Sequence, residues 1–107
     1  MKQHTIYIGL NDSETREQRF GTEKYISILK GVCRSYKVAF SVHRIDGGYF
    51  HDDGTYVEEK TLALSMIDVE DGIVHEIAKD LCAFFHQESV MVTSSTVDAV
   101  FVRERID

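Results

Sequence analysis

Apolar residues recur along this chain with two different periods. Residues 5–10 alternate between apolar and polar positions and are rich in β-forming residues, as in a half-buried strand. From Thr22 to Tyr36, apolar positions recur every three or four residues, which places them on one helical face. These positions are Tyr25, Ile28, Leu29, Val32, Cys33 and Tyr36. The first third of the chain is therefore predicted to form a strand followed by an amphipathic helix.

The central third predicts strands separated by glycine-containing turns. Residues 38–45 alternate as a second strand, and Asp46-Gly47-Gly48 is a tight-turn signal after it. A short third strand is predicted at 49–51, followed by a turn at 52–54. Residues 56–67 then predict a long strand or a bent pair of strands.

The last third predicts a second helix and two more strands. Acidic residues at 68–71 suit the N-terminal dipole of a helix whose apolar stripe runs to Phe85. Residues 90–92 and 97–102 are predicted as the final strands. The order is β-α-β-β-β-α-β-β, and two such helices can cover one face of a sheet. We expect an α+β fold, an antiparallel sheet with both helices packed on one face, as a single domain over 1–107.

Composition narrows the classes of protein that the chain can be. An apolar share of 43% and a charged share of 28% are those of a globular protein and exclude a disordered one. The net charge of −6 disfavours binding to long nucleic acids, although a local cationic pocket is still allowed. Cys33 and Cys82 fit reduced core thiols. Without a signal peptide or a membrane-length apolar run, we expect a cytoplasmic protein that does not bind membranes.

Common catalytic and cofactor motifs are missing from the sequence. It has no Walker A loop, no dinucleotide glycine fingerprint and no serine-hydrolase elbow. His75-Glu76 resembles the start of a zinc-protease helix, but Lys79 stands where the second histidine would be. His51-Asp52-Asp53 could hold a metal, yet a solvated turn explains it as well. We therefore predict no catalytic residue, no metal and no cofactor.

A pair of arginines near the end of the chain suggests an anionic ligand. Arg103 and Arg105 are two apart on a predicted strand and would point the same way. Two guanidinium groups suit a diphosphate, because arginine forms bidentate bonds with phosphate oxygens. The alternative is a solvated chain end that pairs with Glu104 or Asp107.

Five other residues are candidate ligand contacts. Tyr49 and Phe50 are aromatic residues beside a glycine turn, where one ring could stack on a base and the other pack inward. Arg16 and Arg19 could close over a ligand, or lie in an ordinary solvated loop. Asn11 follows the first strand and could bind a ribose or base edge, or simply make a turn.

Two stretches together resemble a known family. Tyr7-Ile8-Gly9-Leu10-Asn11-Asp12 and Gln87-Glu88-Ser89-Val90, with strands around Gly48-Tyr49 and from Glu58 to Leu64, resemble the phage anti-Thoeris proteins of the first type. The resemblance follows the family's order over nearly the whole chain. It implies a sponge that sequesters cyclic ADP-ribose signals of bacterial immunity, and in some members cyclic oligonucleotides, without cleaving them.

The resemblance also implies an assembly and a compartment. Such proteins form homo-oligomers, dimers or hexamers, with pockets between subunits that are lined by arginines and an aromatic ring. A phage-encoded member would act in the host cell cytoplasm. His86 stands here where the family has asparagine before the glutamine-glutamate pair, so this candidate ligand contact departs from the family pattern.

Two other functions remain open at this point. One is a small enzyme with a ferredoxin-like fold, in which His43 or His51 acts as acid and base. The other is a PII-like interaction module without a tightly bound ligand. Turnover of a ligand would indicate the enzyme, and failure to retain any ligand would indicate the module.

Overall fold

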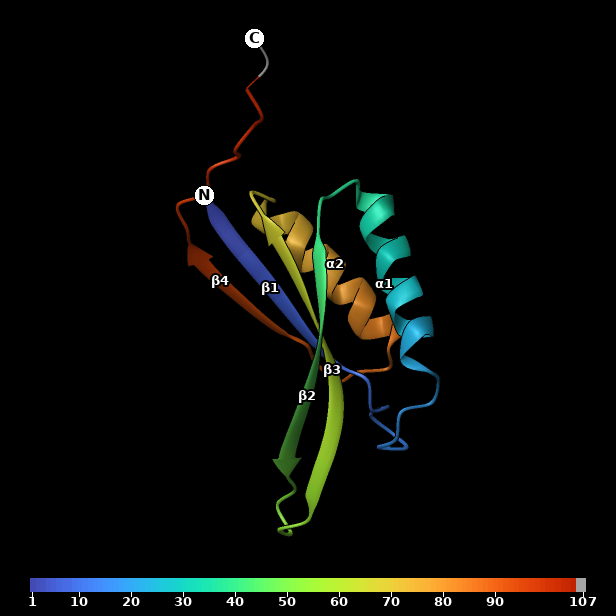
Figure 1. The fold of residues 1–107 in the computed structure, drawn as a ribbon. Helices are drawn as coiled ribbons and strands as arrows, with labels where there is room; N and C mark the ends of the chain where they lie inside the picture. The colour runs from blue at the N-terminus through green and yellow to red at the C-terminus, as the bar shows by residue number, and fades with distance from the viewer. Residues whose placement is uncertain (106–107) are drawn as a thin grey trace.

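The computed structural model describes residues 1–105, which form a four-stranded sheet and two helices (Figure 1). Along the chain the elements are β1 (Lys2–Gly9), α1 (Thr22–Tyr36), β2 (Ser41–Phe50), β3 (Tyr56–Ile67), α2 (Asp71–Phe84) and β4 (Met91–Thr96). The strands lie in the order β2-β3-β1-β4, and every neighbouring pair is antiparallel. This β-α-β-β-α-β arrangement is the ferredoxin-like one.

The core lies between the sheet and the helices. Both helices cover the same face of the sheet (Figure 1), so the predicted α+β fold with two helices on one face is confirmed. Strand residues two apart point to the same face, and those facing the helices are almost fully buried. They include Ile6, Ile8, Leu62, Leu64 and Met66. In the described part of the chain, no helix is both long and apolar enough to cross a bilayer.

The predicted turn at Asp46-Gly47-Gly48 is wrong. These residues lie within β2, where Gly47 pairs with Glu59 and Gly48 with Glu58. The chain reverses at residues 51–55, so the turn predicted at 52–54 is confirmed; there Gly54 has a positive φ of 87° and the Asp53 carboxylate accepts a hydrogen bond from the Thr55 N–H. The predicted second and third strands are therefore one strand.

The predicted strand at 97–102 does not form either. β4 runs antiparallel to β1, and Thr96 is already opposite Lys2. The Val97 N–H still donates to the Met1 carbonyl, and the pairing of this segment with β1 ends there. Residues 97–105 consequently have no regular secondary structure, and Val100, Phe101 and Val102 are 84%, 74% and 90% exposed.

The β2–β3 hairpin reaches well beyond the ends of both helices (Figure 1). Together with residues 97–105 at the opposite end, it gives the molecule an elongated shape of 62 × 26 × 26 Å. The candidate cavities lie where this hairpin leaves the body of the fold, beside the end of β1.

Candidate functional site

The carboxylate of Glu59 lies directly over Gly9, the last residue of β1. A Cβ atom on Gly9 would lie 2.5 Å from the Glu59 Cδ and from both of its carboxylate oxygens. The backbone N–H of Asn11 donates to Glu59 Oε2 at 3.0 Å. Because Gly9 has no side chain and the Asn11 N–H donates a hydrogen bond, the Glu59 carboxylate is fixed at the base of the hairpin.

Asn11 joins three segments of the chain. Its side-chain amide donates to the Glu58 carbonyl at 3.3 Å, and its own carbonyl accepts a hydrogen bond of 2.6 Å from Gln87 Nε2. The hairpin, the end of β1 and the segment after α2 therefore meet at this residue. Asn11 is half-buried, and its neighbours define the walls of the cavities on either side.

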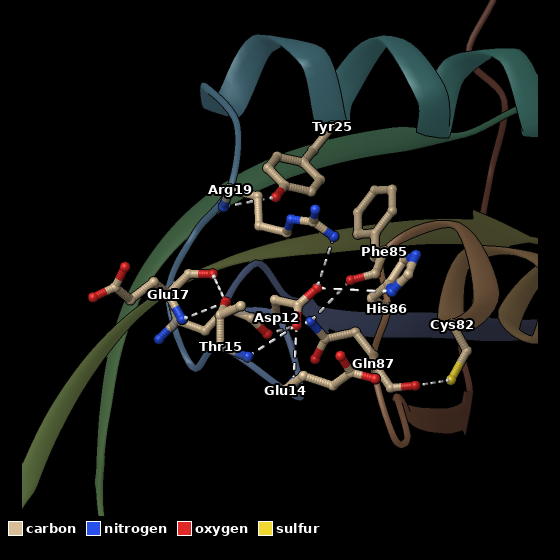
Figure 2. Close-up of polar contacts among 11 residues, drawn as sticks. Asp12, Glu14, Thr15, Glu17, Arg19, Tyr25, Cys82, Phe85, His86 and Gln87 are labelled. Atoms are coloured by element: carbon tan, nitrogen blue, oxygen red, sulfur yellow. Dashed lines mark hydrogen bonds and ion pairs between the residues drawn. The ribbon is translucent and has the colours of Figure 1, made fainter.

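Asp12 fixes the loop that follows β1 (Figure 2). Its side chain is buried, and Oδ1 accepts backbone hydrogen bonds from Glu14 at 2.8 Å and Thr15 at 3.1 Å. Its Oδ2 lies 3.5 Å from Arg19 Nη1 and 3.8 Å from His86 Nδ1. The bonds from Thr15 and Glu14, followed by the positive charge of Arg19, hold the pKa of Asp12 below its ordinary value.

Two cavities adjoin one another at Asn11 and Glu59, which line both. The first has a volume of about 590 Å³ and is bounded by the hairpin, including Tyr56, Glu58 and Lys60. The second, of about 370 Å³, also contacts the loop after β1 and the segment after α2. These volumes fall in the range of small-molecule sites.

Carboxylates outnumber basic groups around the two cavities. The acidic side chains are Asp12, Asp46, Glu58, Glu59 and Glu88, and the basic ones are Arg16 and Lys60. Such a lining attracts cations and opposes phosphate groups. In the part of the chain that the structure describes, no three histidine, cysteine or acidic side chains gather as ligands for a metal ion.

Aromatic side chains border both cavities. Tyr56 lines the first, where its ring covers the Cα of Gly48, so a side chain at Gly48 would collide with it. Tyr49 and His51 line the second, with ring centroids 5.3 Å apart in an edge-on arrangement. These rings offer faces on which a planar base can stack.

The structure brings only some of the sequence-predicted site residues together. Asn11, Arg16 and Tyr49 line the second cavity. Arg19 and His86 line neither cavity, and both lie at the Asp12 carboxylate (Figure 2).

The other three predicted residues lie elsewhere. Phe50 is 71% exposed and packs on Tyr56, with 5.3 Å between ring centroids, and it lines neither cavity. Arg103 and Arg105 follow β4 in the irregular segment, away from the hairpin. They do not share the face of a strand, because the strand predicted for them is absent.

Glu58 and Glu59 are site residues that could not be identified from the sequence. Their only local signal is an acidic pair inside a strand, where glutamate is disfavoured. Asp12 was also missed as the anchor of the loop. Of the two histidines considered for acid–base chemistry, His51 lines the second cavity and His43 does not.

No family model and no curated protein matches the sequence. Several solved structures share the fold. A phage SAM lyase is 22% identical, and the match covers 88% of this chain and 78% of that one in its apo state, with a TM-score of 0.69. The same lyase in complex with S-methyl-5′-thioadenosine matches with a TM-score of 0.68, covering 88% of this chain and 79% of that one at 22% identity.

More distant structures share the fold as well. CutA from Pyrococcus horikoshii is 12% identical with a TM-score of 0.58, and the match covers 92% of this chain and 87% of that one. A duf3240 family protein from Shewanella baltica is 10% identical with a TM-score of 0.57, covering 96% and 97% of the two chains. At these identities the matches show a common fold.

The prediction of a non-catalytic sponge for cyclic ADP-ribose is wrong, and so is the prediction that the protein is not an enzyme. The structural match with a TM-score of 0.69 is to a phage lyase, an enzyme, and nothing favours cyclic ADP-ribose over other ligands. The carboxylate-rich cavities agree with this correction, because they are unsuited to a diphosphate.

Proposed function

We propose that this protein binds S-adenosylmethionine in the two adjoining cavities and cleaves it as a lyase. The observation that carries the proposal is the Glu59 carboxylate, fixed over Gly9 between cavities that are otherwise rich in carboxylates. The fold shared with a phage SAM lyase supports the same reaction class. A phage origin and action in the host cytoplasm fit that likeness.

The charge of the ligand agrees with the charge of the site. S-adenosylmethionine carries a sulfonium, an ammonium and one carboxylate, so its net charge is positive, whereas cyclic ADP-ribose carries a negative diphosphate. Carboxylates at the cavity walls attract the first and repel the second. Arg16, a basic side chain at the wall of the second cavity, is our candidate for binding the carboxylate of the amino-acid part of the ligand.

The remaining groups suit the adenosine part of the ligand. The rings of Tyr49 and Tyr56 offer stacking surfaces for adenine, worth about 1–3 kcal/mol per base. The Asn11 side chain lies between the two cavities and can donate and accept hydrogen bonds at once, which suits a ribose hydroxyl.

The lyase reaction breaks one bond to the sulfonium sulfur. When the bond between sulfur and the aminobutyryl carbon breaks, sulfur keeps the electron pair and leaves as the neutral thioether of S-methyl-5′-thioadenosine. The four-carbon fragment must gain electrons from within itself, either by attack of its own carboxylate or by loss of a neighbouring proton. The protein therefore needs to bind and orient the flexible amino-acid part, which is an entropic contribution to catalysis.

We also infer that the protein acts as a homo-oligomer. In the single chain, the hairpin tip exposes Phe50 and Tyr56, and the segment after β4 exposes Phe101 and Val102. The hairpin and the segment after β4 extend from opposite ends of the fold (Figure 1). Exposed apolar segments of this kind are typical of subunit interfaces. A neighbouring subunit that covers the hairpin would also close the cavities beside it.

The proposal is tested by incubating the purified protein with S-adenosylmethionine and separating the products by liquid chromatography with mass detection. We expect S-methyl-5′-thioadenosine to accumulate in proportion to the amount of protein. Cyclic ADP-ribose, incubated in parallel, should be neither retained nor altered. Recovery of intact S-adenosylmethionine at every protein concentration would refute the lyase reaction.

A further inference from the structure

A second group of reactive side chains lies at the opposite end of β1 from Glu59. His4 is the Cα partner of Ser94 across the β1–β4 pair, and Asp71 is the first residue of α2. His4 is only 2% exposed, although histidine is usually more accessible. The proposed lyase chemistry uses none of these three residues.

The His4 ring connects a hydroxyl to a carboxylate. Its Nδ1 lies 2.6 Å from Ser94 Oγ, and its Nε2 lies 3.1 Å from Asp71 Oδ1. The contact between Nε2 and Asp71 is short enough for a hydrogen bond but is not aligned as one. Nε2 is therefore a buried atom without a hydrogen-bond partner among the described residues. Lys2 Nζ binds the other carboxylate oxygen of Asp71 at 3.2 Å and holds it in place.

The position of Asp71 decides which nitrogen of neutral His4 carries the proton. A lone pair on Nε2 would lie 3.1 Å from a carboxylate oxygen, and the two negative regions repel even without hydrogen-bond alignment, whereas the partial positive charge of an N–H there is attracted to the carboxylate. Nδ1 is then the acceptor, and the Ser94 hydroxyl must donate to it. A serine hydroxyl that donates to an imidazole oriented by a carboxylate has the arrangement of an activated nucleophile.

Ser94 is also accessible. It is exposed, and among residues 1–105 β4 is an edge strand that pairs with β1 alone. The Asp71 side chain is 61% exposed, so the group is open to solvent on two sides. Ser95, the next residue, is equally an exposed serine but points to the other face of the sheet.

We propose that Ser94 is a second reactive site of this protein, a nucleophile toward activated acyl esters, with His4 as its general base and Asp71 as a positioning residue. In the acylation step, Ser94 Oγ bonds to the acyl carbon and its proton passes to His4 Nδ1. The alkoxide or phenolate leaves with the electron pair of the broken C–O bond; an alkoxide takes up the proton from His4, whereas a phenolate leaves as the anion and His4 gives the proton to solvent. The product is an acyl ester on Ser94, which water hydrolyses in a second step.

The test uses p-nitrophenyl acetate with the full-length protein. Release of p-nitrophenolate is followed by absorbance, and the acetylated residue is located by peptide mass mapping after brief reaction. We expect Ser94 to be acetylated about 100-fold faster than Ser95, which is the size of a general-base contribution. Ser94→Ala should abolish the fast phase, whereas Ser95→Ala should leave it unchanged.

The role of Asp71 is tested separately, because His4 is buried and its replacement would disturb the packing around it. Asp71→Asn should slow acetylation of Ser94 about tenfold or more, and Asp71→Glu should restore most of the rate. Equal acetylation of Ser94 and Ser95, or an Asp71→Asn rate equal to that of wild type, would overturn the proposal.

Discussion

Replacing Glu59 by glutamine tests the charge argument at the centre of the site. Glutamine has nearly the same shape, and its carbonyl oxygen can still accept the hydrogen bond from the Asn11 N–H, which is 3.0 Å long in the structure. The fold should therefore survive, and the main change is the loss of one negative charge. Glu76→Gln is a matched control, because Glu76 lies on α2 beside Lys79 and lines neither cavity.

The size of the effect follows from Coulomb's law. A unit charge about 4 Å from a carboxylate gains about 4 kcal/mol at an effective dielectric constant near 20 and about 1 kcal/mol in bulk water. Glu59 is half-buried, so an intermediate value of about 2 kcal/mol applies. This corresponds to about a 30-fold loss of affinity for a cation held beside it.

Two non-reactive ligands separate charge from shape. Sinefungin carries an amine in the place of the sulfonium methyl group, whereas S-adenosylhomocysteine has a neutral thioether there. Isothermal titration calorimetry should show that Glu59→Gln weakens sinefungin by about 30-fold and S-adenosylhomocysteine by less than about threefold. We propose that the sulfonium of S-adenosylmethionine lies beside Glu59, and an equal loss for both ligands, or no loss for sinefungin, would refute this.

Gly9→Ala complements this experiment, because it displaces the same carboxylate without removing its charge. The new Cβ would lie 2.5 Å from both Glu59 oxygens, so the side chain must move. We expect sinefungin to lose affinity in this variant as well. If the Gly9→Ala variant binds sinefungin like wild type, the precise position of Glu59 is unimportant.

Other features of the structure give independent predictions. Asp12→Asn should lower the melting temperature at pH 7. Because the folded-state pKa of Asp12 lies below the unfolded value near 4, the difference in melting temperature from wild type should shrink as pH falls below about 4 and through the folded-state pKa. A difference in melting temperature that acid leaves unchanged would contradict this. Burial raises the pKa of Cys33 to about 11, so iodoacetamide at pH 8 should leave it unlabelled until urea is added; rapid labelling of the native protein would exclude a closed core there. Phe101→Ser should raise the subunit dissociation constant by about 10- to 100-fold, as measured by analytical ultracentrifugation, and an unchanged oligomer would place the interface elsewhere.

Much of the fold could be predicted from the sequence because its signals are local. The apolar spacing of three and four along α1 marks the residues that are buried, among them Leu29, Val32 and Cys33. The glycine pair at 47–48 misled the prediction because a turn motif is only a local preference. Cross-strand pairing of β2 with β3 continues past it, and the chain turns at Gly54 instead.

The candidate site was less predictable because its contacts are distant in sequence. Glu59 and Asn11 are 48 residues apart, and Gln87 is 76 residues from Asn11. The sequence has no periodic pattern that marks the space above Gly9, and none that marks the contact between the hairpin, the end of β1 and the segment after α2. Arg103 and Arg105 gave the stronger sequence signal, but their assignment depended on a strand at 97–102 that the structure does not contain.

The whole chain and the two cavities are both negatively charged, and this favours a cationic ligand over an anionic one. A net charge of −6 by itself only disfavours nucleic acids and leaves open a separate cationic pocket for a phosphate ligand. The structure instead adds local carboxylates at Glu58 and Glu59 to that overall field. A diphosphate would then have to approach against both fields and bind with Arg16 and Lys60 as the basic groups at the cavity walls. The negative field of the whole protein and that of the cavities both attract a sulfonium ligand, because fields of the same sign together raise the local concentration of a counter-ion. The proposed lyase reaction would remove that positive charge from sulfur, so the neutral thioether product would lose the attraction that holds the cationic ligand and could leave.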